Sequence, residues 1–102
     1  MTFVVVYNYK IPSEKTMDYI NLEKQAIDIY MEYGCEEVQI YRDSKKPNRW
    51  MEINRFRDYE SYQEIISKID GDPRMESLYA KFKELLYDGE PEPEKRSYYR
   101  II

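Results

Sequence analysis

The stretch "RWMEINRF", residues 49–56, decides how the chain is interpreted, because it reads as a strand that mixes two kinds of side chain on one side. Strand alternation places Met51 and Ile53 on one face. The opposite face carries Trp50, Glu52, Asn54 and Phe56. A solvated face would explain the carboxylate and the amide but not the rings, and a dry core would explain only the rings. The pattern therefore predicts a face that lines a cavity or a wet interface.

The residues on either side of this stretch predict strands and helices in the order β-α-β-β-α-α-β, in a single α+β domain spanning 1–102. Ser13, Asp58 and Asp72 are expected to cap helices, and Gly34 is expected to end the first one. The predicted strands are 3–11, 36–42, 49–56 and 97–102; the predicted helices are 14–33, 59–69 and a third from Pro73 to Leu86; and 88–95 is an acidic linker.

Alternation in the other strands suggests which sheet face the helices cover. The more uniformly apolar set is expected beneath them: Phe3, Val5, Tyr7, Tyr9, Ile11, Val38, Ile40, Met51 and Ile53. The mixed set is expected on the uncovered face: Val4, Val6, Asn8, Gln39, Tyr41, Trp50, Glu52, Asn54 and Phe56. Because a large apolar surface favours association, a homodimer through this face is expected, with a cavity or ordered water retained around the polar groups.

Composition restricts the classes of function. The net charge of −4 argues against nucleic acid as the main partner. The basic cluster at 44–49 is either a solvated hairpin loop or an anion contact. The absence of histidine excludes histidine-based triads and histidine ligation of a metal or haem. Cys35 is the only cysteine, either a small buried apolar residue or a reactive thiol. No segment has the character of a membrane span or a signal peptide, so a cytoplasmic location is expected.

The stretch "INRFRDYESYQEIISK", residues 53–68, and the order of elements resemble the dimeric α+β-barrel superfamily. The similarity is to antibiotic-biosynthesis-monooxygenase-like and NIPSNAP-like domains, in which an aromatic residue ends a strand and an acidic cap begins the next helix. Phe56 and Asp58 occupy these places, and residues 72–86 resemble the helix that follows. The resemblance implies a ferredoxin-like βαββααβ antiparallel sheet with helices on one face, and a homodimer whose sheets close a barrel.

The resemblance also implies a ligand pocket, either between sheet and helices or inside the barrel. Some members of the group oxidise polyphenols or quinone precursors without a metal or flavin, and others degrade haem. Asn8 and Phe56 stand at positions similar to those of the haem-degrading branch, but the missing histidine argues against that activity.

Glu52 is the leading candidate for chemistry, because a carboxylate in a partly dry pocket becomes a stronger base. Its alternative role is an ion pair with Arg42, Arg55 or Arg100, of the same chain or of a second subunit. Asn8 and Asn54 are candidate donors to an oxyanion, or structural partners of nearby polar groups. The candidate ligand-binding side chains are Tyr41, Trp50, Phe56 and Gln39, with an interface anchor as the alternative role of Trp50.

No metal site and no cofactor is expected. Asp70, Asp72 and Glu76 lack the ligand spacing of a calcium loop, and helix capping explains them better. The expected function is binding of a small aromatic or apolar ligand, with cofactor-independent monooxygenase-like catalysis as one form of it. A non-catalytic dimeric module that binds a ligand or a protein, and an interface without any ligand, stay open as alternatives.

Overall fold

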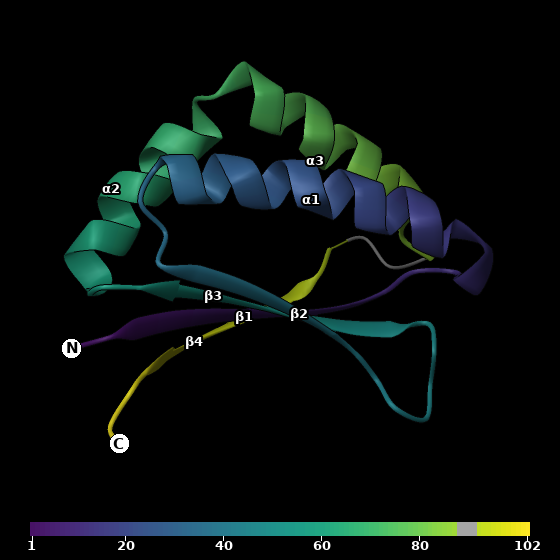
Figure 1. Ribbon diagram of the computed structural model, residues 1–102, viewed down its shortest axis with the longest axis horizontal. Helices are drawn as coiled ribbons and strands as arrows, with labels where there is room; N and C mark the ends of the chain where they lie inside the picture. The colour runs from purple at the N-terminus through teal and green to yellow at the C-terminus, as the bar shows by residue number, and fades with distance from the viewer. Residues whose placement is uncertain (88–91) are drawn as a thin grey trace.

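The structure, a computed structural model, describes residues 1–87 and 92–102. Its three α-helices lie on one side of a four-stranded antiparallel sheet, and the described residues place no helix on the other side (Figure 1). The predicted α+β fold and element order are confirmed. The elements are β1 (Phe3–Lys10), a 3-10 turn η1 (Ser13–Lys15), α1 (Thr16–Glu32), β2 (Glu37–Arg42), β3 (Arg49–Phe56), α2 (Tyr59–Asp70), α3 (Pro73–Leu85) and β4 (Glu94–Tyr99).

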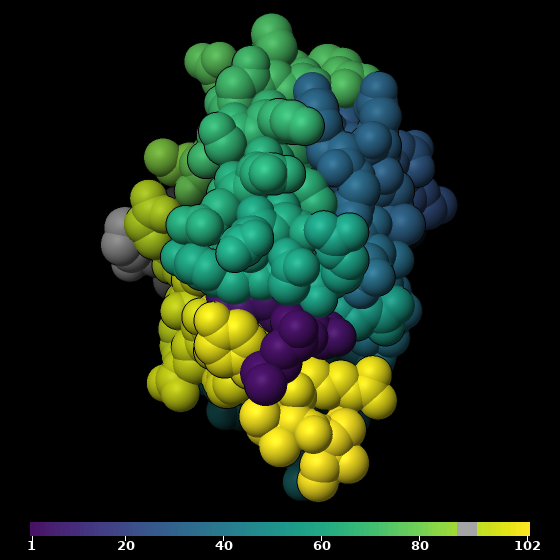
Figure 2. Space-filling view, turned by 90° about the vertical axis from the view of Figure 1, so that its left-hand side faces the viewer, coloured from purple at the N-terminus to yellow at the C-terminus, as the bar shows by residue number. Residues whose placement is uncertain are grey.

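The sheet has the strand order β2-β3-β1-β4, so the first strand of the chain lies beside the last. Figure 2 shows that the two chain ends emerge together below α2, where the Arg100 amide donates to the Thr2 carbonyl at 3.0 Å. The last strand begins three residues before its predicted start, because Glu94 already pairs with Asn8 of β1. Of the predicted linker, 88–91 lie outside the described residues, and the part from Glu94 belongs to β4.

The predicted assignment of β3 to the two sheet faces is wrong. Directly opposed residues of an antiparallel pair share a face, and Tyr7 pairs with Glu52 while Tyr9 pairs with Trp50. The side of β3 that bears Glu52 therefore faces the chain's own helices. The exposed fractions agree: Phe56 0%, Asn54 1%, Glu52 8% and Trp50 8%.

The error has a physical cause. Alternation divides each strand into two sets, but only the register between strands says which sets lie together. Met51 and Ile53 looked like the core set because both are apolar, yet burying Trp50 and Phe56 removes far more apolar surface from water. Met51 and Ile53 instead lie on the uncovered face, opposite Asn8 and Val6 of β1.

Two groups of buried side chains fill the space between sheet and helices. One packs Tyr9 and Trp50 of the sheet against Tyr19 of α1 and Phe82 of α3. The other packs residues from β1, β3 and α2 around Cys35: Phe3, Val5, Phe56, Ile65 and Ile69. Tyr7 and Met75 touch both groups. The boundary between the two groups is where the pocket described below is found.

The helix ends follow local chemistry at three of the four predicted positions. Asp58 accepts from the Ser61 amide at 2.7 Å, and Asp72 accepts from the Arg74 amide at 2.8 Å, so both predicted caps are confirmed. Gly34 follows α1 with φ of 104°, a conformation that favours glycine, and confirms the predicted helix end. The Ser13 cap is wrong, because Ser13 lies in the 3-10 turn and α1 begins only at Thr16.

Candidate functional site

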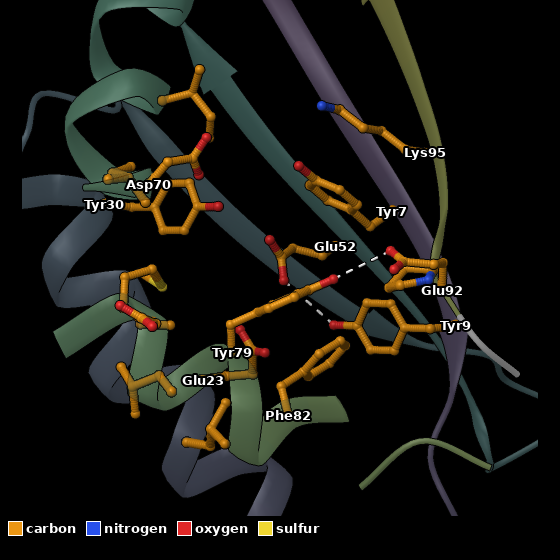
Figure 3. Close-up of a pocket in the computed structure, with 18 residues that line it drawn as sticks. Tyr7, Tyr9, Glu23, Tyr30, Glu52, Asp70, Tyr79, Phe82, Glu92 and Lys95 are labelled. Carbon is orange, nitrogen blue, oxygen red and sulfur yellow. Dashed lines mark hydrogen bonds between the residues drawn. The ribbon is translucent and has the colours of Figure 1, made fainter. Parts of the chain in front are cut away.

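A pocket of about 520 Å³ lies between the sheet and the three helices, and we call it the inner pocket. Glu52 of β3 and Glu23 of α1 lie close together within it, and Lys95 of β4 stands at another side (Figure 3). The aromatic walls are Tyr7 and Tyr9 of β1, Tyr30 of α1, and Tyr79 and Phe82 of α3. A cavity of this size, with aromatic and aliphatic walls and polar groups between them, suits a small molecule.

Two carboxyl groups are buried together in the inner pocket. Glu23 is 7% exposed and Glu52 is 8% exposed, and their side chains are joined by a hydrogen bond. Burial raises the pKa of both groups, and the charge of Glu52 raises that of Glu23 further. Hydrogen bonds from Asn54, Glu23 and Tyr9 act in the opposite direction on the pKa of Glu52. Because Glu52 already accepts hydrogen bonds from Tyr9 and Asn54, we assign the shared proton to Glu23, which donates it to Glu52, and the negative charge to Glu52.

A chain of tyrosine hydroxyl groups also ends at Glu52. Tyr9 donates to Oε1 of Glu52 at 3.4 Å, and the Tyr9 hydroxyl is hydrogen-bonded to the Tyr19 hydroxyl (Figure 3 shows the first contact). Since Tyr9 uses its hydrogen on Glu52, Tyr19 is the donor to Tyr9. Burial raises the pKa of Tyr9 and of Tyr19 above the ordinary value. Both phenols stay protonated, so they act as donors that stabilise the buried negative charge.

Glu23 was missed by the sequence analysis although the sequence contains a signal for it. Tyr19, Glu23, Ala26 and Tyr30 follow one another at helical spacing, so they lie on one face of α1. A lone charged residue on a mainly apolar helix face commonly reaches out to water, so this spacing alone does not predict a functional glutamate. What makes Glu23 different is the second carboxyl group opposite it on β3, and this proximity depends on the strand register.

No protein-family model and no curated protein matches the sequence, but solved structures do match. A NIPSNAP family protein from Agrobacterium tumefaciens aligns with a TM-score of 0.79 at 15% identity, covering 99% of this chain and 94% of that chain. A conserved protein from Methanosarcina mazei Go1 gives 0.77 at 20% identity, covering 96% and 91%. SnoaB, a cofactor-independent oxygenase from Streptomyces nogalater, gives 0.76 at 10% identity, covering 97% and 92%. The chain shares their fold.

The predicted resemblance to antibiotic-biosynthesis-monooxygenase-like and NIPSNAP-like domains is confirmed at the level of the fold. Identities of 10% to 20% show the fold alone, so no ligand or activity is carried over with it.

The predicted site residues separate into two groups. Glu52 and Asn54 lie together on the helix side, where Asn54 donates to Glu52 and leaves its own buried Oδ1 without a partner. Asn8, Gln39 and Tyr41 are exposed on the uncovered side, since Asn8 pairs with Met51 and Tyr41 does so as well. The prediction that Glu52 shares one site with Asn8 and Tyr41 is therefore wrong.

Trp50 and Phe56 share the helix side with Glu52 but do not line the inner pocket. Trp50 packs on Tyr19 with ring centres 4.7 Å apart, and Phe56 packs on Tyr62 at 5.0 Å. Trp50, Asn8 and Tyr41 border a different hollow of about 780 Å³ at one end of the sheet. Both rings thus support the core around the inner pocket and do not form its walls.

None of the three predicted arginine partners of Glu52 contacts it. Arg55 pairs with Glu37 at 3.0 Å and with Glu36 at 3.6 Å. Arg42 lies over the Trp50 ring at 5.7 Å, and Arg100 donates to the Ile102 carbonyl at 2.9 Å. Within the chain the ion-pair alternative for Glu52 is therefore wrong, because the donors that the described residues offer to it are uncharged.

Three further features of the described residues bear on function: membrane spans, metal ligands and the cysteine. No helix among them is long and apolar enough to cross a membrane. Within residues 1–87 and 92–102, no group of three or more His, Cys, Asp or Glu side chains is placed to hold a metal ion. Cys35 is buried, its thiol donates to the Arg55 carbonyl at 3.2 Å, and burial raises the pKa of this thiol, so it has the character of a packed core residue.

Proposed function

We propose that this protein binds a small molecule with an aromatic or apolar body in the inner pocket. The observation that supports the proposal is the Glu23–Glu52 pair, a costly buried charge placed where a hollow with aromatic walls opens beside it. Both carboxyl groups line the inner pocket, so the pair borders open volume. Glu52 is then the polar contact that orients the ligand.

Thermal-shift screening against phenols, quinones, haem and fatty acids tests this proposal. A ligand present at 100 times its Kd is expected to stabilise the protein by about 2.7 kcal/mol. Ile66 lines the inner pocket from α2, so Ile66→Trp is expected to fill the hollow and abolish the shift. Tyr59→Trp adds the same ring at an exposed position of α2 and should keep it. A shift that survives Ile66→Trp would place the ligand elsewhere.

A second candidate function is cofactor-independent oxygenation, favoured by the raised pKa of Glu52, because a buried carboxylate is a stronger base. Glu52 takes a proton from an activated CH2 group, and the resulting anion reacts directly with dioxygen. One oxygen atom enters as a carbonyl, and the other leaves as water with the two displaced hydrogens. With anthrone as probe, dioxygen uptake is expected to fall about 100-fold or more in Glu52→Gln. Uptake unchanged in this variant would exclude Glu52 as the base.

We also propose that a second copy of the chain covers the uncovered sheet face. Its central strands present Val4, Val6, Met51 and Ile53, with the exposed ring of Tyr98 beside Val4 on β4. A contiguous apolar surface of this kind on a small domain favours association. A homodimer formed this way would leave the inner pocket of each copy on the far side of its own sheet.

Ile53→Lys is expected to convert the dimer into a monomer, because it places a charge in the middle of this face opposite Val6. Light scattering after size exclusion measures the change in mass. Gln63→Lys, at an exposed position of α2, adds the same charge away from the face and should stay dimeric. A wild-type monomer at micromolar concentration would rule the proposal out.

A further inference from the structure

The inner pocket has an unequal distribution of charge. Five of its lining residues carry carboxyl groups: Glu23, Glu52, Asp70, Glu76 and Glu92. Among its lining residues in the described part of the chain, Lys95 is the only base. Even with one proton shared by Glu23 and Glu52, the pocket is acidic. An anionic ligand would be repelled there, and a cationic one attracted.

Lys95 does not neutralise the carboxyl pair. Its Nζ donates to the Tyr62 hydroxyl at 2.9 Å and lies 5.9 Å from the centre of the Tyr7 ring. Figure 3 shows the amine beyond the Tyr7 ring, with Glu52 and Glu23 on the other side of that ring. Among the described residues, the negative charge of Glu52 is therefore met by neutral donors, and a ligand could bring the positive charge that these residues do not supply.

The aromatic walls of the inner pocket provide a second kind of contact for a cation. Tyr7, Tyr30 and Tyr79 line it together with Phe82, and the negative face of an aromatic ring attracts ammonium groups. The chain already uses this contact at the border of the pocket, where Lys83 lies 5.6 Å from the centre of the Tyr79 ring. The hydroxyl of the same Tyr79 donates to Glu92, another residue of the pocket lining, at 3.3 Å (Figure 3).

We propose that the ligand of the inner pocket is a small amine in its protonated form, with the ammonium group at Glu52 and an apolar or aromatic body against the tyrosine walls. This inference rests on the proposed function and names the class of ligand. A neutral alcohol of the same shape can donate one hydrogen bond to Glu52 but leaves its charge uncompensated. A carboxylate of the same shape adds a further negative charge to the five carboxyl groups.

Titration calorimetry with three probes that share a phenylethyl body tests the inference: phenethylamine, 2-phenylethanol and 3-phenylpropionate, all in one buffer of low ionic strength. Phenethylamine is expected to bind at least about tenfold tighter than 2-phenylethanol, because hydrogen bonds between charged groups are stronger than neutral ones. No binding of 3-phenylpropionate is expected. If either uncharged or anionic probe binds within tenfold of the amine, the inference is overturned and the proposed function stands. If none of the three binds, the inference is overturned, and the thermal-shift screen described above decides the proposed function.

Variants then assign the preference to Glu52. Glu52→Gln is expected to weaken phenethylamine binding by about tenfold or more and to leave 2-phenylethanol nearly unchanged. Glu64→Gln makes the same change at an exposed position of α2 outside the pocket and should bind both probes as the wild type does. An amine affinity equal in Glu52→Gln and wild type overturns the inference. The wild-type comparison of the three probes decides the question even if Glu52→Gln does not fold.

Discussion

Phe56→Ala is expected to lower the free energy of unfolding by about 3–5 kcal/mol, the range for truncating a fully buried ring. Phe56 is 0% exposed and packs among Phe3, Val5 and Ile65. Its loss leaves a cavity between β3 and α2 that the surrounding side chains cannot fill. Urea denaturation followed by circular dichroism measures the change.

Phe56→Leu is the matched control, since it keeps most of the apolar volume and should cost below about 1.5 kcal/mol. The pair of variants tests which side of β3 faces the helices. On the uncovered face, Phe56 would contribute little to the stability of the single chain. A cost below about 1 kcal/mol for Phe56→Ala would therefore contradict the strand register described above.

Glu23→Gln is expected to raise the free energy of unfolding at pH 8, by about 1.4 kcal/mol for each unit by which folding raises the pKa of Glu23, because the amide needs no proton to be buried. The amide can still donate to Glu52, so it reproduces the protonated form of Glu23 without the ionisation. Glu52→Gln is expected to be less stable than Glu23→Gln by about 1–3 kcal/mol, because its amide hydrogens would meet the donors of Asn54 and Tyr9.

The sign of the pH dependence follows from the raised pKa of Glu23 in the folded chain. Its contribution to stability is fully present below the pKa of an unfolded glutamate, about 4.3, and is lost as the pH rises through the higher folded-state value. The advantage of Glu23→Gln should accordingly be small near pH 4 and increase towards pH 8. Thermal unfolding of both proteins across this range measures it. An advantage that is independent of pH, or a more stable Glu52→Gln, would mean that Glu23 does not hold the proton.

Much of the fold could be predicted from local signals. The strand at 49–56 has the bounds of β3, and the caps Asp58 and Asp72 mark where α2 and α3 begin. These features depend on neighbours within a few residues, so sequence spacing is enough to find them. The last strand was predicted three residues too late, because the charged residues Glu94 and Lys95 resemble a linker. Only their pairing with β1 makes them part of the strand.

The candidate site could be predicted only in part. Glu52 and Asn54 were identified because polar residues beside Trp50 and Phe56 are unusual in any strand. Glu23 and the separation of Asn8 from Glu52 could not be predicted, because both depend on contacts between distant segments. The register that pairs Tyr7 with Glu52 depends on how much apolar surface the whole sheet buries against the helices. No single strand determines that amount.

The strand order leaves β2 and β4 at the two borders of the sheet, each with a row of backbone groups that another chain could pair with. Both borders carry ionic side chains: Glu94, Lys95 and Arg96 follow one another on β4, and Glu37 and Arg42 mark the ends of β2. Such charges oppose the addition of further strands and so protect the protein from growing into fibrous aggregates. The apolar surface that remains for contact with another chain is then the uncovered face of the sheet. In the proposed dimer, one second copy would cover it.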